Sequence, residues 1–344
     1  MNKLPALGKI HPEFFNKVIY PRLGHPDKSV LVKPQHGVDF GVIGLGGKVL
    51  VLSTDPFFIA KELGIEKAAW FAVHILASDV AVSGIAPRYM SVDLNLPLEM
   101  TAKELTRMWA AVDRECKNLG INIVTGHTAR YAGCSYPMVG GATIIGIGSK
   151  KDLIMPKVNV GDAIIISKGP AIEATGLMSA YFPKPLEARY GKAFVKKAQD
   201  VYYQMSTIKD AEIAAAAGGV TAMHDATECG IYGGLFEMAS HSGVGMDINR
   251  DDIILQDVVK KVCECFNIDP YTAISEGTLL ATVKKSRAKN VIAALEEEGI
   301  PCSIAGEAVP KRNGMHVYAS GLKRKLVHPE VDPFWIRFEE YSKK

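Results

Sequence analysis

The sequence predicts an α/β protein of two domains. Strand-like and helical segments alternate through both halves of the 344-residue chain, as expected for helices layered on sheets. A polar stretch, residues 150–162, interrupts this alternation and carries Pro156. Hydrophobic residues make up 48% of the chain and charged residues 22%, which is enough for each half to bury a core. We therefore expect an N-terminal domain of mixed sheet over residues 1–156 and a C-terminal α/β domain over residues 157–344.

The N-terminal half begins with a Pro-punctuated extension that holds one short helix. A hairpin follows, and its connection, Gly44-Leu45-Gly46-Gly47, lets the backbone adopt positive φ. Thr101 with Glu104 three residues later predicts a capping box at a helix start. The expected strands are 38–43, 48–52, 88–96, 121–124 and 144–148, and the expected helices are 66–82 and 101–119.

The C-terminal half restarts the alternation after the polar stretch. Residues 224–234 are expected to be a Gly-containing loop that leads into a helix ending at Ser242. The other expected strands are 163–167, 279–283 and 301–305, and the other expected helices are 212–217 and 288–298.

Composition excludes several classes of protein. The net charge of +3 is too small for a dedicated nucleic-acid binder. No apolar run is long enough to span a membrane, and the first 15 residues lack the apolar core of a signal peptide. The six cysteines form no CxxC pair, which indicates reduced thiols rather than a disulfide framework. We therefore expect a cytoplasmic protein.

Two acidic residues flank the predicted hairpin. Asp39 lies near the start of its first strand and Asp55 lies just beyond its second. A four-residue turn would put position 39 opposite about position 52, with the two carboxylates on the order of 10 Å apart. Such carboxylates could share Mg²⁺ through water and phosphate oxygens. Both are also common turn residues, so a purely structural role stays open.

Asp79 is the sharper signal, because it lies inside a helix that is apolar on nearly every face. Only His74, Ser78 and Asp79 are polar in the run AAWFAVHILASDVAV. A buried carboxylate costs several kcal/mol unless it is paired, hydrogen-bonded or bound to a metal. Asp79 is therefore either a functional residue or an acceptor for backbone N–H groups of a neighbouring loop.

Two further segments resemble ligand-binding loops. Gly126-His127-Thr128 follows a short apolar strand, where α/β sheets place ligands. His127 could contact phosphate, bind a metal, act as a general base, or be structural. Residues 224–230, His-Asp-Ala-Thr-Glu-Cys-Gly, precede a helix, so Asp225 or Thr227 could cap it and the free N–H groups could bind phosphate.

In this order, the segments resemble the PurM-like ATP-dependent family, which includes aminoimidazole ribonucleotide (AIR) synthetase, selenophosphate synthetase, thiamine-monophosphate kinase and HypE. Ser78-Asp79, followed by Gly84 and Pro87, is similar to a helix end typical of the family. The other matching segments are Gly37-Val38-Asp39, Thr54-Asp55, Thr125-Gly126-His127-Thr128, residues 224–230 and residues 275–280.

The resemblance implies N-terminal domains whose strands pair across a homodimer, with ATP and Mg²⁺ at that interface and the C-terminal domain closing over them. It implies that Asp39, Asp55 and Asp79 bind Mg²⁺ and that Gly126, His127 and Thr128 line the phosphates. It further implies that Asp225 faces the phosphates and shares the catalytic role with His127. The shared chemistry activates an acceptor oxygen by phosphoryl transfer from ATP.

The second half is most similar to the HypE branch, but the chain lacks that branch's C-terminal cysteine, its last cysteine being Cys302. We therefore do not expect dehydration of a group carried on its own C-terminus. The hypothesis is an ATP- and Mg²⁺-dependent homodimer that acts on a small-molecule or protein-borne acceptor, alone or with a maturation partner protein. The alternatives are AIR synthetase, a small-molecule kinase like thiamine-phosphate kinase, or a non-catalytic ATP-binding accessory protein.

Overall fold

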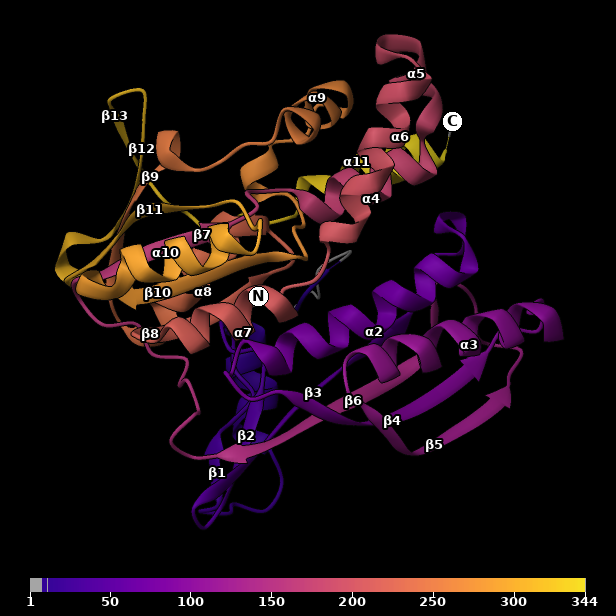
Figure 1. The fold of residues 1–344 in the computed structure, drawn as a ribbon, viewed down its shortest axis with the longest axis horizontal. Coiled ribbons are helices and arrows are strands. Elements are labelled where there is room, and N and C mark those ends of the chain that lie inside the picture. The colour runs from indigo at the N-terminus through magenta and orange to yellow at the C-terminus, as the bar shows by residue number, and fades with distance from the viewer. Residues whose placement is uncertain (1–7, 11, 344) are drawn as a thin grey trace.

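The computed structural model describes residues 8–10 and 12–343. It contains two mixed β-sheets with helices packed on them (Figure 1). The predicted α/β architecture of two domains is therefore confirmed. Residues 150–161 connect the two sheets and form neither helix nor strand, which supports a proposed domain boundary at 156/157.

The first sheet has six strands in the order β1-β2-β3-β6-β4-β5. Their bounds are β1 (Val30–Val32), β2 (Gly41–Leu45), β3 (Lys48–Phe58), β4 (Pro87–Leu96), β5 (Asn122–Arg130) and β6 (Met138–Ser149). Helices α2 (Ile65–Ala81) and α3 (Ala102–Asn118) pack together along one face of this sheet (Figure 1). The capping box of Thr101 and Glu104 starts α3 as predicted. A short helical segment that begins with α1 (Pro12–Phe14) precedes β1.

The second sheet has seven strands in the order β13-β12-β9-β11-β7-β10-β8. Their bounds are β7 (Asp162–Ser167), β8 (Val220–Ala226), β9 (Gly245–Asn249), β10 (Thr278–Lys284), β11 (Cys302–Val309), β12 (Met315–Ala319) and β13 (Leu322–Lys325). Helices α7 (Ile208–Ala217) and α10 (Ala288–Glu297) contact each other and this sheet, and α8 (Gly230–Ser242) also packs on it. Buried residues of α7 and α10 belong to one core cluster and those of α8 to another, so the sheet is enclosed by separate cores.

A third group of helices lies beside α2. Its members are α4 (Ile172–Tyr181), α5 (Pro183–Tyr190), α6 (Lys192–Asp200), α9 (Asp257–Phe266) and α11 (Pro333–Ser342). Their buried residues form one cluster that also contains Phe71 of α2.

One apolar core joins the two domains. It contains Val51 and Leu76 from the first domain together with Ile165 and Leu295 from the second. Helix α2 contacts β3 and β6 on one side and α7 and β8 on the other. This double coverage explains why α2 is apolar on nearly every face.

The hairpin differs from the prediction in its turn and its register. Strand β2 continues to Leu45, so only Gly46 and Gly47 form the turn, and Gly41 pairs with Leu52. The expected pairing of position 39 with position 52 is therefore wrong by two residues. Asp39 precedes β2 and is not part of its pairing with β3, so the register of the hairpin does not determine where Asp39 lies.

Two segments that were expected to be loops are strands. Residues 125–128 continue β5, and His224 and Asp225 lie within β8. Neither Asp225 nor Thr227 caps α8. That helix begins after Cys229, whose backbone adopts a left-handed conformation and whose side chain makes no capping hydrogen bond.

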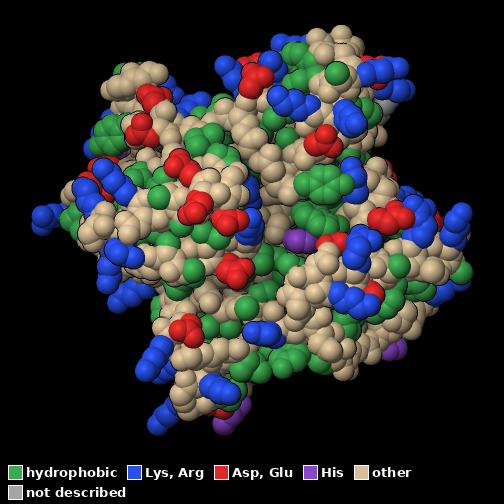
Figure 2. Space-filling model, viewed as in Figure 1, with side chains coloured by type: hydrophobic (Ala, Val, Ile, Leu, Met, Phe, Trp, Pro, Cys, Tyr) green, Lys and Arg blue, Asp and Glu red, His purple; other side chains and the backbone are tan. Residues whose placement is uncertain are grey.

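The surface agrees with the small net charge. Lys and Arg side chains are scattered among Asp and Glu on the visible face and form no single basic patch (Figure 2). Within residues 8–10 and 12–343, every helix is too short or too polar to cross a membrane. All six cysteines are free.

Candidate active site

Four carboxylates from distant segments converge where the two domains meet. Asp39 precedes β2, Asp55 is in β3, Asp79 is in α2 and Asp225 is in β8. Burial raises the pKa of Asp79 well above its usual range, and the charges of Asp225, Asp55 and Asp39 raise it further. We call these four residues the acidic cluster. The structure therefore brings together the three residues predicted to bind metal and Asp225.

Asp79 is held in place by the first sheet. Its side chain is buried, and Ser53 Oγ of β3 donates a hydrogen bond to Asp79 Oδ2 at 2.6 Å. Ser53 and Asp55 are two residues apart on β3 and project to the same face of the sheet, toward α2. Among the described residues, the hydrogen bond donated to Asp79 thus comes from a neighbouring hydroxyl group rather than from backbone N–H groups, which were the structural alternative.

Asp225 is buried beside the charged imidazole of His224, whose Nδ1 lies 3.9 Å from Asp225 Oδ1. Asp225 is 0% exposed, and neither carboxylate oxygen has a hydrogen-bond partner among the described residues. Burial and the nearby charge of Asp39 raise the pKa of Asp225 to about 7. A carboxylate in this position is costly unless a ligand compensates it.

His224 links the acidic cluster to helix α8. Its Nδ1 lies 2.6 Å from Asp39 Oδ1, and its Nε2 lies 3.6 Å from Glu237 Oε2. Glu237 in turn lies 3.3 Å from His328 Nε2. Burial opposes a charge on His224, but the attraction of Asp39 and Glu237 outweighs it and raises the pKa of the imidazole to about 10. Asp39 and Glu237 therefore hold the ring charged.

Two glutamates join the site from the second domain. Glu276, just before β10, is 1% exposed, and neither of its carboxylate oxygens has a hydrogen-bond partner among the described residues. Burial raises the pKa of Glu276 well above its usual range, and the nearby charges of Asp225 and Glu173 raise it further. Its backbone N–H donates to Glu173 Oε2 at 3.2 Å, and burial raises the pKa of Glu173 to about 8.

Sequence reasoning assigned no role to these two glutamates. Glu173 could have been noticed by the same criterion as Asp79. It is the one charged residue in the apolar helix α4, just as Asp79 is the one carboxylate in the apolar run of residues 68–82. Glu276 lay in a segment noted only for its family resemblance. Its proximity to Asp225 depends on the pairing of β8 with β10.

Lys9 approaches the site from the N-terminal extension. Its backbone N–H donates to Glu228 Oε2 at 2.7 Å, and its Nζ donates to Thr227 Oγ1 at 3.0 Å. Loss of solvation opposes the charge of Lys9, but the attraction of Glu237, Asp39 and Glu228 outweighs it and raises the pKa of the ammonium group. Nothing in the sequence around Lys9 pointed to this contact.

Gly126, His127 and Thr128 lie farther away, on the exposed edge strand β5. Asp55 pairs with Ala142, Ala142 with Val92, and Val92 with Gly126. Three strand spacings separate Asp55 from Gly126, which is about 14 Å. A Cβ atom at position 126 would lie 2.3 Å from the Val92 carbonyl oxygen, so close strand packing by itself requires this glycine.

His127 contacts a residue that follows the end of its own strand, β5. Its Nε2 lies 3.2 Å from Tyr131 Oη, and its side chain is exposed. Within one chain, the structure therefore keeps His127 apart from the acidic cluster.

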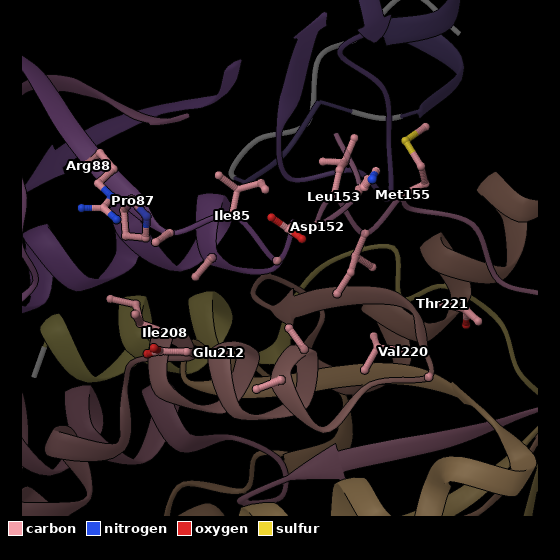
Figure 3. A pocket seen from close by; sticks show the side chains of 18 of the residues that line it. Ile85, Pro87, Arg88, Asp152, Leu153, Met155, Ile208, Glu212, Val220 and Thr221 are labelled. Atoms are coloured by element: carbon pink, nitrogen blue, oxygen red, sulfur yellow. The ribbon is translucent and has the colours of Figure 1, made fainter. Parts of the chain in front are cut away.

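A cavity of about 1050 Å³ lies between the domains, away from the acidic cluster. Ile85, Pro87 and Arg88 line it from the first domain, and Ile208 and Glu212 line it from α7 (Figure 3). It reaches the start of β8 at residues 220–221, whereas Asp225 lies near the end of that strand. None of the predicted site residues lines this cavity.

Comparison with known proteins identifies related chains over nearly the full length. A family model for the N-terminal domain of AIR synthase related protein matches residues 37–148, and a model for its C-terminal domain matches residues 159–318. A hydrogenase expression/formation protein of Methanocaldococcus jannaschii is 25% identical over 336 residues, covering 95% of this chain and 96% of its own. The carbamoyl dehydratase HypE of Escherichia coli is 24% identical over 309 residues, covering 87% and 88%.

A solved structure shares the fold. The hydrogenase maturation protein HypE in complex with ATP matches with a TM-score of 0.67 at 22% identity, covering 94% of this chain and 93% of its own. Together these matches confirm the family resemblance drawn from the motifs.

Proposed function

Because the chain belongs to the AIR synthase related family of ATP-using enzymes, we propose that it transfers the γ-phosphoryl group of ATP to an acceptor oxygen in a Mg²⁺-dependent reaction. The acceptor is a small molecule or a group carried on a protein, and a maturation partner protein is a candidate carrier. The observation that carries the proposal is the acidic cluster, which both domains build together.

The donor set of the acidic cluster fits a hard divalent cation. Carboxylate oxygens are the ligands that Mg²⁺ prefers, and Mg²⁺ is commonly held by one or two carboxylates together with substrate phosphates. The oxygens of Asp225, which accept no hydrogen bond from the described residues, and the raised pKa of Asp79 support a site where a divalent cation would stabilise the charged carboxylates. Asp39, Asp55 and Asp79 would hold the cation, which neutralises charge on the phosphates when bound.

The remaining groups would position the reactants. In the reaction, the acceptor oxygen forms a bond to the γ-phosphorus while the bond to the β-γ bridging oxygen breaks, and ADP leaves. Asp225 would face the phosphates from β8. Glu276 has a raised pKa and lies beside Asp225, which suits a group that exchanges a proton with the acceptor.

A homodimer would bring β5 to a shared site. The sheet face opposite α2 and α3 carries two cross-strand apolar rows, Ile43–Leu50–Ile147 and Leu52–Ile145–Tyr89. Ile147 is 40% exposed and Tyr89 is 38% exposed. An uncovered apolar sheet face is typical of an interface. In such a dimer Gly126, His127 and Thr128 would line the phosphates at the interface, with His127 in a catalytic role.

The test combines thermal unfolding with ADP release. ATP with Mg²⁺ should raise the melting temperature of the wild-type protein, and a screen of candidate acceptors should identify one that triggers ADP release. Asp79→Asn should abolish the nucleotide-dependent shift, whereas Asp113→Asn, an exposed carboxylate on α3, should retain it. An unchanged shift in Asp79→Asn contradicts the metal assignment. Stabilisation without ADP release for every acceptor would favour the non-catalytic accessory protein.

A further inference from the structure

We propose that the cavity between the two domains binds a small organic anion that carries an apolar ring system. Lys151 and Lys157 would pair with the anionic group, a carboxylate, phosphate or sulfonate, and the ring system would lie between the apolar side chains of the two walls. This inference goes beyond the proposed function and does not depend on it.

The cavity has the size and position of a small-molecule site. Its volume is about 1050 Å³, and small-molecule sites commonly measure about 300–1,000 Å³ and often lie between domains. Thr221 lines the cavity at the start of β8, and Asp225 lies four residues farther along that strand, which is about 13 Å. A molecule bound in the cavity would therefore be separate from the acidic cluster.

One wall is built by the end of α2 and the segment that connects the two sheets. The Ile154 N–H donates to the Ser83 carbonyl oxygen at 2.8 Å. Gly84 has a positive φ of 76°, and a Cβ atom there would lie 2.9 Å from the Asp152 carbonyl oxygen. The connecting segment is therefore packed tightly onto the end of α2, so this wall is already formed in the ligand-free protein.

Helix α7 forms the opposite wall (Figure 3). Ile208, Glu212 and Ala215 recur at i, i+4 and i+7, so they share one face of the helix, and Ala216 also lines the cavity. The two alanines leave space that larger side chains would fill. Met155 lines the first wall and is 43% exposed. A ring system held between Met155 and this face of α7 would remove apolar surface from water, which stabilises the complex.

Two lysines of the connecting segment bring unpaired charge to the cavity. Among the described residues, the side chains of Lys151 and Lys157 form no ion pair and no hydrogen bond. The charged lining residues of this segment are these two lysines and Asp152, which gives 2 − 1 = +1. A cavity lined by an excess of one sign of charge concentrates ions of the opposite sign, so an anionic group should bind here.

The far end of the cavity is balanced in charge, which gives the ligand an orientation. Arg88 of β4 and Glu212 of α7 lie on opposite walls, and Figure 3 shows both well away from Met155. The Lys157 backbone N–H donates to the Met155 carbonyl oxygen at 2.7 Å, so Lys157 belongs to the Met155 end. The anionic group should therefore face the connecting segment, and the ring system should extend toward Ile208.

The test is a fluorescence titration of the full chain with anilinonaphthalene sulfonate, a ring system with one anionic group, in the absence of nucleotide. Binding should be saturable at a single site. The neutral phenylnaphthylamine, which lacks the sulfonate, should bind about tenfold or more weakly. The double variant Lys151→Gln/Lys157→Gln should weaken binding of the sulfonate by a similar factor, whereas Lys103→Gln, exposed on α3, should bind it like the wild type.

Filling the cavity provides a second test. Ala216→Trp should abolish binding, because the indole would occupy the place of the ring system. Ala188→Trp is the matched control, since Ala188 is also an exposed alanine on a helix but lies on α5, outside the cavity. Sulfonate binding that is unchanged in Ala216→Trp overturns the inference.

Three measurements on the wild-type protein decide the matter even if a variant fails to fold. ATP with Mg²⁺ should leave the sulfonate bound, because the cavity is separate from the acidic cluster. Displacement of the sulfonate by ATP would place it at the nucleotide site and overturn the inference. Equal affinity for the neutral probe, or absence of saturable sulfonate binding, also overturns it.

Discussion

His224 Nδ1 lies 2.6 Å from Asp39 Oδ1, and this ion pair joins the two domains at the acidic cluster. The two residues are 185 positions apart in the sequence. The imidazolium supplies positive charge among carboxylates that would otherwise repel one another. The ligand-free protein therefore already carries one positive group at the place where we propose that a cation binds.

Glu276→Gln should separate stability from turnover. The neutral amide removes a buried carboxyl group that Asp225 and Glu173 destabilise, so the free energy of unfolding of the ligand-free protein should rise by on the order of 1 kcal/mol. ADP release should fall by about 100-fold or more. Chemical unfolding and ADP release measure the two effects, and Glu212→Gln, exposed on α7, serves as the control. A loss of both stability and turnover would indicate a structural role for Glu276.

The sequence predicted the architecture well where local signals are strong. The apolar run around Asp79 and the capping box of Thr101 located α2 and α3 to within a residue or two. Helix α4 carried no clear periodicity, because it is buried on most sides and contains Gly176. The short strands β12 and β13 form an edge hairpin with little apolar patterning.

The candidate site was predictable only in part. Asp79 was identifiable because a carboxylate in an apolar helix is costly wherever that helix packs. The pairing of Asp39 with His224 was not, since it depends on how the two domains dock. The edge position of His127 likewise depends on the order of strands in the sheet.

His74 should make the stability of the protein depend on pH. Burial and the nearby charge of Lys168 lower the pKa of His74 to about 4, although the negative charge of Glu115 acts in the opposite direction. The unfolded chain, with an ordinary pKa of 6.5, therefore binds more protons between these values. Stability should be lost as the pH falls from about 6.5 to about 4, by up to about 3 kcal/mol.

Unfolding of His74→Gln across this pH range checks the effect. Glutamine can still hydrogen-bond to Ser206 Oγ, which lies 2.8 Å from His74 Nδ1, but does not titrate. Its stability should fall less steeply with decreasing pH than that of the wild type. His25→Gln, an exposed histidine, should follow the wild-type curve. Equal slopes for His74→Gln and the wild type would show that His74 does not titrate in this range.

Ile147→Asp should disrupt the proposed homodimer. The residue lies in the apolar row with Ile43 and Leu50 on the uncovered sheet face, where a charge would have to be desolvated on association. Sedimentation velocity should show a dimer for the wild type and a monomer for the variant. Val160 lies in the segment that connects the two sheets and is 54% exposed, so the control Val160→Asp should remain dimeric. A wild-type monomer at micromolar concentration would contradict the dimer.

The most direct test of the acidic cluster is calorimetric titration with a non-hydrolysable ATP analogue, in the presence and absence of Mg²⁺. Binding should require the cation, and Asp55→Asn should weaken it by about tenfold or more, because one carboxylate proposed to hold the cation is removed. The ligand-free Asp55→Asn protein should remain folded, as shown by its unfolding transition. Binding of the analogue with equal affinity without Mg²⁺ and in Asp55→Asn would contradict the claim that these carboxylates hold a metal–nucleotide complex.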